Sequence, residues 1–217
     1  AEYVNEKEKN VFFITTLHQS FDSYAYGLDI QQRKEWDKVR GRFKELTFNE
    51  PVEQLLFIVS EYLKESDTEI PSDKFFDEYL SLIKKSKVFP LQNELNTLLF
   101  KNIFPIEPLA AATLSLALQK YGQNERSLFT FLQSDDLYGL NNYDSKKHSF
   151  YDLVCVYDYL IYNHHSFISS KYNQDFIQWN ALKKSLERIE VAFDEGVDQL
   201  KAIVKTVGLL NIFANSG

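Results

Sequence analysis

The sequence predicts a mainly α-helical protein with one or two short strands near the N-terminus. Two observations lead to this fold class. Only 7 Gly and 5 Pro punctuate 217 residues, so long helices are favoured over many short strands. Apolar side chains recur at three- and four-residue spacing along most of the chain, as in amphipathic helices. The 18 Phe and 13 Tyr indicate a core built largely of aromatic rings.

The two predicted strands lie in the first fifty residues. Residues 11–17, VFFITTL, form an apolar, β-branched and aromatic run, which is typical of a buried strand. Residues 42–48 alternate loosely enough to form a second, short strand. Between the two, the chain is expected to be helical over 20–39, and Asp29 suits the N-cap of the second half of this segment.

Helices dominate the rest of the chain. Pro51 fits the first turn of a helix that Asn49 would cap. The stretch 87–107 is hydrophobic but mixed, and a turn-rich loop over 134–149 is the best internal boundary. Gly208 is expected to bend or divide the last helix. The remaining expected helices cover 72–86, 108–120, a segment starting at 124, 149–163, 171–190 and 195–213.

Charge and cysteine usage restrict the function classes. The formal net charge of −7 argues against a general nucleic-acid-binding surface, which needs a basic patch. A single Cys155 excludes an intramolecular disulfide framework and fits a reducing compartment. No stretch approaches the ~18–20 apolar residues of a membrane span, and the N-terminus is no signal peptide. We therefore expect a cytoplasmic protein without membrane contact.

Catalytic patterns are few. Cys155 lies in an apolar run and fits a buried small hydrophobe better than a nucleophile. His164 and His165 end a predicted helix, a common place for His, and no metal site is predicted. A Gly-rich phosphate-binding loop is absent, so this chain alone is expected to hydrolyse no nucleotide. The sequence begins without Met and contains none, which indicates an excised fragment or the loss of modified methionines.

Three phrases in order carry a family resemblance: FFITTLHQSF (12–21), VRGRFKELTFNEP (39–51) and FPIEPLAAATLSLALQKYGQNERSLFTFL (104–132). Together they resemble the second half of a P-loop ATPase of the AAA+ kind. The likeness is nearest to large bacterial ATPases related to the origin-recognition and STAND groups, often linked to phage defence or DNA restriction. It covers roughly residues 10–135, and a weaker similarity at 201–213 corresponds to the approach to a winged-helix region.

The resemblance implies a role for an arginine that follows the predicted helix 20–39. Arg42, with Arg40 as the alternative, would be an arginine finger, and Arg126 would be the sensor-2 residue of a helical lid. A forked guanidinium stabilises charge on γ-phosphate oxygens better than an ammonium does. Taken without the resemblance, Arg42 fits an exposed helix-end cation equally well. Arg126 fits a local partner of Asp135 or a cap of a neighbouring helix.

A second implied role is the sensor-1 polar group at the end of the first strand. Thr16, His18 and Gln19 are the candidates, and the sequence does not choose among them. By the same resemblance, residues 1–50 would be a remnant of the ATPase core, 51–134 the lid and 149–217 a C-terminal helical segment.

The function implied is nucleotide sensing and coupling within a larger ATPase. ATP and Mg²⁺ would be cofactors of the parent protein and not of this chain. Its partners would be the parent's other subunits or domains. The principal alternative is a self-contained helical interaction domain with no nucleotide role, which the acidic charge and the aromatic richness suit equally well. A small metal- or His-dependent enzyme is a third and weaker reading.

Overall fold

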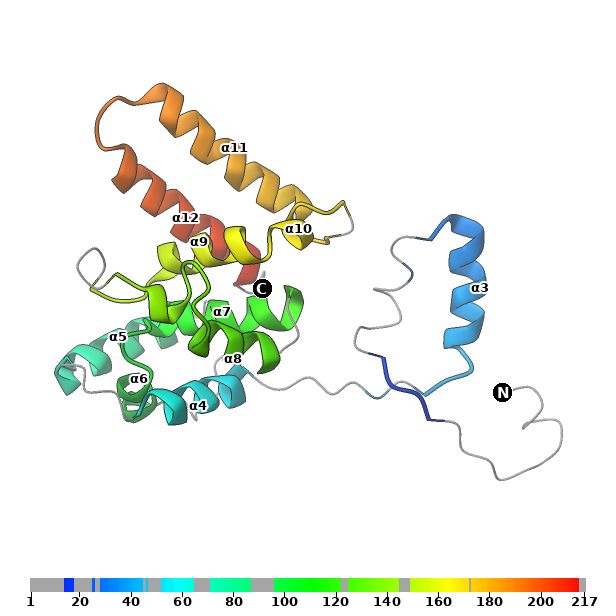
Figure 1. Ribbon diagram of the computed structural model, residues 1–217, viewed down its shortest axis with the longest axis horizontal. Helices are drawn as coiled ribbons and strands as arrows, with labels where there is room; N and C mark the ends of the chain where they lie inside the picture. The colour runs from blue at the N-terminus through cyan, green and yellow to red at the C-terminus, as the bar shows by residue number, and fades with distance from the viewer. Residues whose placement is uncertain are drawn as a thin grey trace. The chain divides into compact units, whose positions relative to one another are not determined.

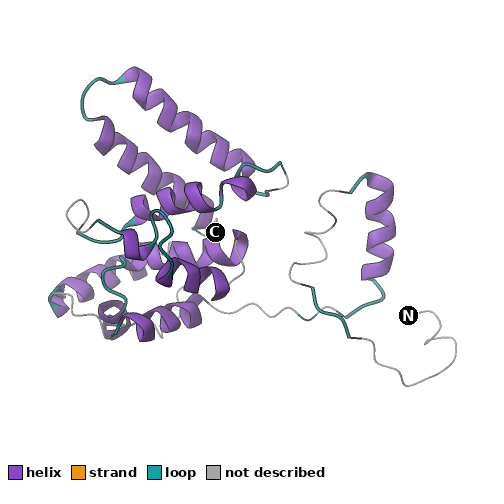
Figure 2. Cartoon of the chain, viewed as in Figure 1, coloured by secondary structure: helices purple, strands orange, loops and turns teal. Residues whose placement is uncertain are grey.

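The computed structural model describes residues 14–17, 25, 28–44, 46, 52–64, 71–86, 96–121, 125–144, 149–171 and 173–214. Of these, 72% are helical and none belongs to a strand, which confirms the mainly α-helical fold (Figure 2). The helices are α3 (Ile30–Arg40), α4 (Val52–Leu63), α5 (Asp73–Ser86), α6 (Thr97–Asn102), α7 (Pro108–Tyr121), α8 (Glu125–Gln133), the 3₁₀ turn η1 (Leu140–Asn142), α9 (Leu153–Asn163), α10 (His165–Ile168), α11 (Phe176–Ala192) and α12 (Val197–Phe213).

The chain divides into two compact units, Ala1–Asn49 and Glu50–Gly217. In the first unit, α3 begins with the predicted cap. The Asp29 carboxylate accepts a hydrogen bond from the Gln32 backbone N–H at 2.8 Å. The Gln32 side chain in turn accepts one from the Asp29 N–H at 3.2 Å. This reciprocal capping box satisfies two backbone donors and fixes where α3 starts.

Helix α7 is the centre of the second unit. It contacts α4, α8, α9 and α12, and Figure 1 shows it among them. Its small residues Ala110, Ala111 and Ala117 are almost fully buried, so neighbouring helices approach its backbone closely. The helix expected over 108–120 is therefore surrounded by other helices. Helices before and after the loop 134–149 therefore pack on one core, within one compact unit.

Helices α11 and α12 form an antiparallel hairpin (Figure 1). Gly208 does not divide α12, because the helix runs unbroken from Val197 to Phe213. A Cβ atom at Gly208 would lie 2.4 Å from Leu182 Cδ1 of α11. The glycine thus lets the two helices approach closely, which is a packing role that a one-dimensional pattern does not distinguish from a helix break.

Two further differences concern the predicted strands and the stretch 87–107. The strand predicted at 11–17 is described only over 14–17, where no strand is formed, and its other residues lie outside the described part of the chain. The strand predicted at 42–48 begins instead as a turn, in which Phe43 N–H donates to Arg40 C=O at 3.0 Å. Part of 87–107 forms the short helix α6, whose N-cap Asn96 accepts from the Leu99 N–H.

Candidate functional site

The two candidate arginine fingers lie at the C-terminal end of α3. Arg40 is the last residue of this helix and is half-buried, whereas Arg42 is exposed. Successive turn hydrogen bonds, from Gly41 N–H to Asp37 C=O and from Arg42 N–H to Val39 C=O, both 3.0 Å, fix the backbone here. Cations near a helix C-terminus are favoured by the helix dipole, so this placement also has a purely local explanation.

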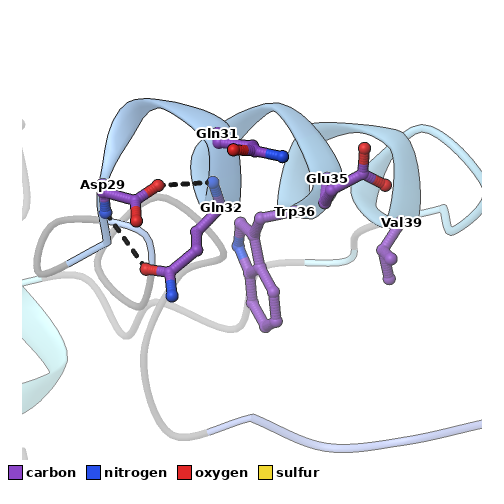
Figure 3. Close-up of a pocket in the computed structure, with 6 residues that line it drawn as sticks. All are labelled: Asp29, Gln31, Gln32, Glu35, Trp36 and Val39. Atoms are coloured by element: carbon purple, nitrogen blue, oxygen red, sulfur yellow. Dashed lines mark hydrogen bonds between the residues drawn. The ribbon is translucent and has the colours of Figure 1, made fainter.

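An open depression of about 530 Å³ lies along the same helix (Figure 3). The charged side chains among its lining residues are the carboxylates of Asp29 and Glu35, and Trp36 also lines it. Neither Arg40 nor Arg42 lines it. Two carboxylates repel phosphate, so the depression does not fit a nucleotide.

The other candidates are placed only in part. Thr16 is exposed, and His18 and Gln19 lie outside the described residues. Arg126 occupies the second position of α8, in the unit that begins at Glu50, whereas Arg42 belongs to the unit that ends at Asn49. The arginine-finger and sensor-2 candidates therefore belong to different compact units.

The reactive residue types in the second unit have structural roles. Burial, then the nearby Asp152 carboxylate, raises the pKa of the Cys155 thiol to about 12, so Cys155 is protonated at neutral pH. His164 is the C-cap of α9, as predicted, and burial lowers its pKa. His165, predicted to end the same helix, instead begins α10. Within the described part of the chain, no three His, Cys, Asp or Glu residues gather in a group able to hold a metal ion.

A buried polar cluster lies where α7 meets the start of α11. Asp175, 8% exposed, accepts hydrogen bonds from Tyr121 Oη at 2.6 Å and from Lys120 Nζ at 2.8 Å. The indole Nε1–H of Trp179 donates to Tyr121 Oη at 2.9 Å. Burial, then the hydrogen bond to Asp175, raises the pKa of Tyr121, which keeps its hydroxyl a donor at neutral pH. We call these four residues the α7–α11 junction.

Asp175 occupies the N-cap position of α11 but makes no side-chain cap. Its backbone has ψ 13°, whereas the capping residues Asp29 and Asp152 have ψ 174° and −176°. An N-cap side chain reaches the first-turn N–H groups from the extended conformation. The Asp175 carboxylate is thus diverted from its own helix to α7, and its backbone conformation is the one that permits this.

A second acid has a similar tertiary role. Glu107, directly before α7, accepts a hydrogen bond from the Tyr79 hydroxyl of α5 and one from the Leu153 N–H, the first amide of α9. The backbone N–H of the same residue, Glu107, donates to Tyr151 C=O at 3.1 Å. Burial raises the pKa of Glu107, and the hydrogen bond from Tyr79 lowers it in part. Glu107 therefore joins the starts of α7 and α9 to α5.

Comparison with known proteins provides no assignment. No protein-family model, curated protein or solved structure matches this chain. None of the helices in the described ranges combines the length and apolar character needed to cross a bilayer.

Sequence reasoning missed the α7–α11 junction entirely. Tyr121 and Asp175 are 54 positions apart, and each looks like an ordinary helix-end residue. The helix was expected over 171–190, so Asp175 lay inside it; in the structure α11 begins at Phe176 and Asp175 is its N-cap residue. Asn173 accepts a hydrogen bond from the Asp175 N–H at 2.9 Å.

Proposed function

We propose that this chain is the nucleotide-sensing and coupling part of an AAA+-like ATPase, with no turnover of its own. The observation that supports it best is the position of Arg42. This exposed residue lies on a hydrogen-bonded turn, and the boundary between the two compact units follows at Asn49. An arginine finger that precedes the junction of core and lid would occupy such a place.

The depression along α3 is lined by carboxylates, which do not suit a phosphate. In this proposal, ATP and Mg²⁺ would be bound by other parts of the parent protein. Arg42 would reach the γ-phosphate of a neighbouring subunit, where its guanidinium would stabilise the charge that develops during transfer. A cytoplasmic location and a role in phage defence or DNA restriction belong to the same proposal.

The test is steady-state ATPase activity of the longer protein that contains this chain. Arg42→Ala should lower turnover by roughly 10³-fold with nucleotide binding nearly intact, and Arg42→Lys should restore little. Arg188→Ala, at an exposed arginine of α11, is the matched control and should have no effect. Mixing Arg42→Ala subunits with subunits that cannot bind phosphate should recover part of the activity. Unchanged turnover in Arg42→Ala would refute the proposal.

A second candidate, a helical protein-interaction domain, is favoured by the α11–α12 hairpin. Four of its large aliphatic side chains face solvent: Val191 is 90% exposed, Ile177 78%, Val207 60% and Ile203 59%. Exposed aliphatic residues at i and i+4 on one helix, such as Ile203 and Val207, are a common anchor pattern for a partner. Under this reading, Ile203→Ser with Val207→Ser abolishes partner binding by the purified chain, whereas Arg42→Ala leaves it intact.

A further inference from the structure

We propose that α12 pairs, in antiparallel orientation, with the α12 of a second copy of this chain. The contact is an apolar stripe whose members follow one another at spacings of three, four and three residues: Leu200, Ile203, Val207 and Leu210. This inference names the partner for the surface on which the interaction-domain candidate rests. It does not depend on the nucleotide proposal.

The first step of the argument is that the stripe lies on the outer side of the helix. Residues that recur at three and four positions lie on one face of a helix. Ile203 is 59% exposed and Val207 60%, whereas Leu200 and Leu210 are half-buried. A different face, which contains the fully buried Leu209, holds α12 on its own chain.

The second step is that the stripe carries no charge. Helix α12 has three charged side chains, Asp198, Lys201 and Lys205. Because successive residues of a helix are about 100° apart, all three lie on the side away from the stripe. Lys201 forms an ion pair with Glu190 of α11, and Lys205 forms one with Asp158 of α9. The stripe can therefore pack on another apolar surface without burying a charge.

The third step is that the stripe is self-complementary. Its four members are placed symmetrically about position 205: Ile203 and Val207 are each two residues away, and Leu200 and Leu210 are each five away. In an antiparallel pair with a two-fold axis at this position, Ile203 of one copy meets Val207 of the other, and Leu200 meets Leu210. The two helix dipoles then also oppose each other, which is favourable.

The residues that border the stripe fit the same pairing. They are uncharged: Gln199 and Thr206 on one side, Val204 and Asn211 on the other. In an antiparallel pair of helices, each border lies against the same border of the partner helix. No like charges meet in this arrangement, so nothing electrostatic opposes association of two copies.

The size of the stripe predicts a weak dimer. Helix α12 has 17 residues and is about 25 Å long. One helix from each copy forms a smaller contact than the standard interface of about 1,600 Å². We therefore expect a dissociation constant on the order of 10 μM.

Sedimentation velocity of the whole chain tests the association. The weight-average mass should rise from monomer toward dimer between about 1 and about 500 μM, and salt should have little effect. Ile203→Glu should raise the dissociation constant at least about tenfold, because the carboxylate would be buried in the contact. Ile177→Glu, at a 78% exposed isoleucine of α11, is the matched control and should leave association unchanged. Circular dichroism should show equal helicity in both variants.

A wild-type chain that stays monomeric over the whole range would overturn the proposal. A dimer that persists in Ile203→Glu would overturn it too, and so would equal weakening by Ile177→Glu. If the monomeric chain instead bound another protein through Ile203 and Val207, the dimer would be refuted and the interaction-domain candidate would stand. The two failures are thus distinguishable.

A charge pair tests the orientation. Ile203→Glu/Val207→Lys places a glutamate of one copy opposite a lysine of the other at both symmetry-related contacts. This double variant should associate at least about threefold more tightly than Ile203→Glu or Val207→Lys alone, and high salt should remove the gain. In a parallel pair, glutamate would face glutamate and lysine would face lysine. Absence of any gain in the double variant would overturn the antiparallel arrangement.

Discussion

The starts of α9 and α11 have the same residue type at the same position and use it differently. Asp152 accepts from the Val154 and Cys155 N–H groups at 2.9 and 3.0 Å and so completes its own helix. Asp175 leaves α11 uncapped and holds α7 instead. The difference shows that a helix-start acid can stabilise either its own helix or a tertiary contact, and that the backbone ψ angle separates the two roles.

The largest expected effect comes from removing Asp175, the aspartate that makes the tertiary contact with α7. Asp175→Ala should lower the free energy of unfolding by about 2–3 kcal/mol, because the buried Tyr121 hydroxyl and the Lys120 ammonium lose their acceptor. Urea denaturation of the chain measures this. Asp198→Ala provides the baseline for an exposed aspartate, and an equal loss in both variants would remove the distinction drawn for Asp175.

A smaller loss, about 1 kcal/mol, is expected for Asp152→Ala, because one cap is lost. Asparagine sharpens the contrast. Asp152→Asn should recover most of the stability, since asparagine is an equally good N-cap. Asp175→Asn should recover little, because an amide cannot replace a carboxylate that binds an ammonium. Similar recovery at the two positions, in the same denaturation experiment, would show that both acids act as caps.

Asp29→Ala should have a local effect of roughly 0.5–1 kcal/mol on α3. This capping box is exposed and belongs to the first compact unit, so the second unit should be unaffected. Carbon chemical shifts of residues 30–40 should report reduced helicity. Faster amide hydrogen exchange in α7 or α9 would contradict the expectation that this cap affects α3 alone.

The smallest expected effect is on the pH dependence of the free energy of unfolding, and it comes from Glu107, the acid that contacts α5 and α9. Its folded pKa lies above the ordinary value, so folding favours the protonated form. The stability that this group contributes is therefore present at low pH and is lost as pH rises through the folded pKa. The free energy of unfolding of the wild type relative to Glu107→Gln should fall as pH rises above the ordinary glutamate pKa of about 4.3. Denaturation curves at several pH values measure this difference in the free energy of unfolding. A difference that rises or stays constant as pH rises would contradict the expectation.

The helices were predicted well from the sequence, because their buried apolar residues recur at regular spacing along the chain. In α4, Leu55, Val59 and Leu63 recur at four-residue spacing and are all buried, so the pattern reports the core directly. It also predicted the Asp29 cap, because that cap involves residues three positions apart.

What the sequence could not predict depends on contacts between distant residues. Gly208 looks like a break, but Leu182, 26 positions earlier, explains it as a close approach. Asp175 falls inside the helix expected over 171–190, and its contacts with Tyr121 and Lys120, more than fifty positions earlier, leave no local pattern. The roles inferred for Arg42, Arg126 and the sensor-1 candidates stay predictions, because they concern a nucleotide site that would be completed outside this chain.

The most direct test of the account is to compare Asp152→Asn with Asp175→Asn in urea denaturation of the chain. The account predicts that Asp152→Asn keeps nearly the wild-type free energy of unfolding, because asparagine can cap α9 as aspartate does. Asp175→Asn should lose most of the stability that Asp175→Ala loses, because an amide cannot replace the carboxylate that holds the Lys120 ammonium. Equal free energies of unfolding in the two asparagine variants would contradict the account.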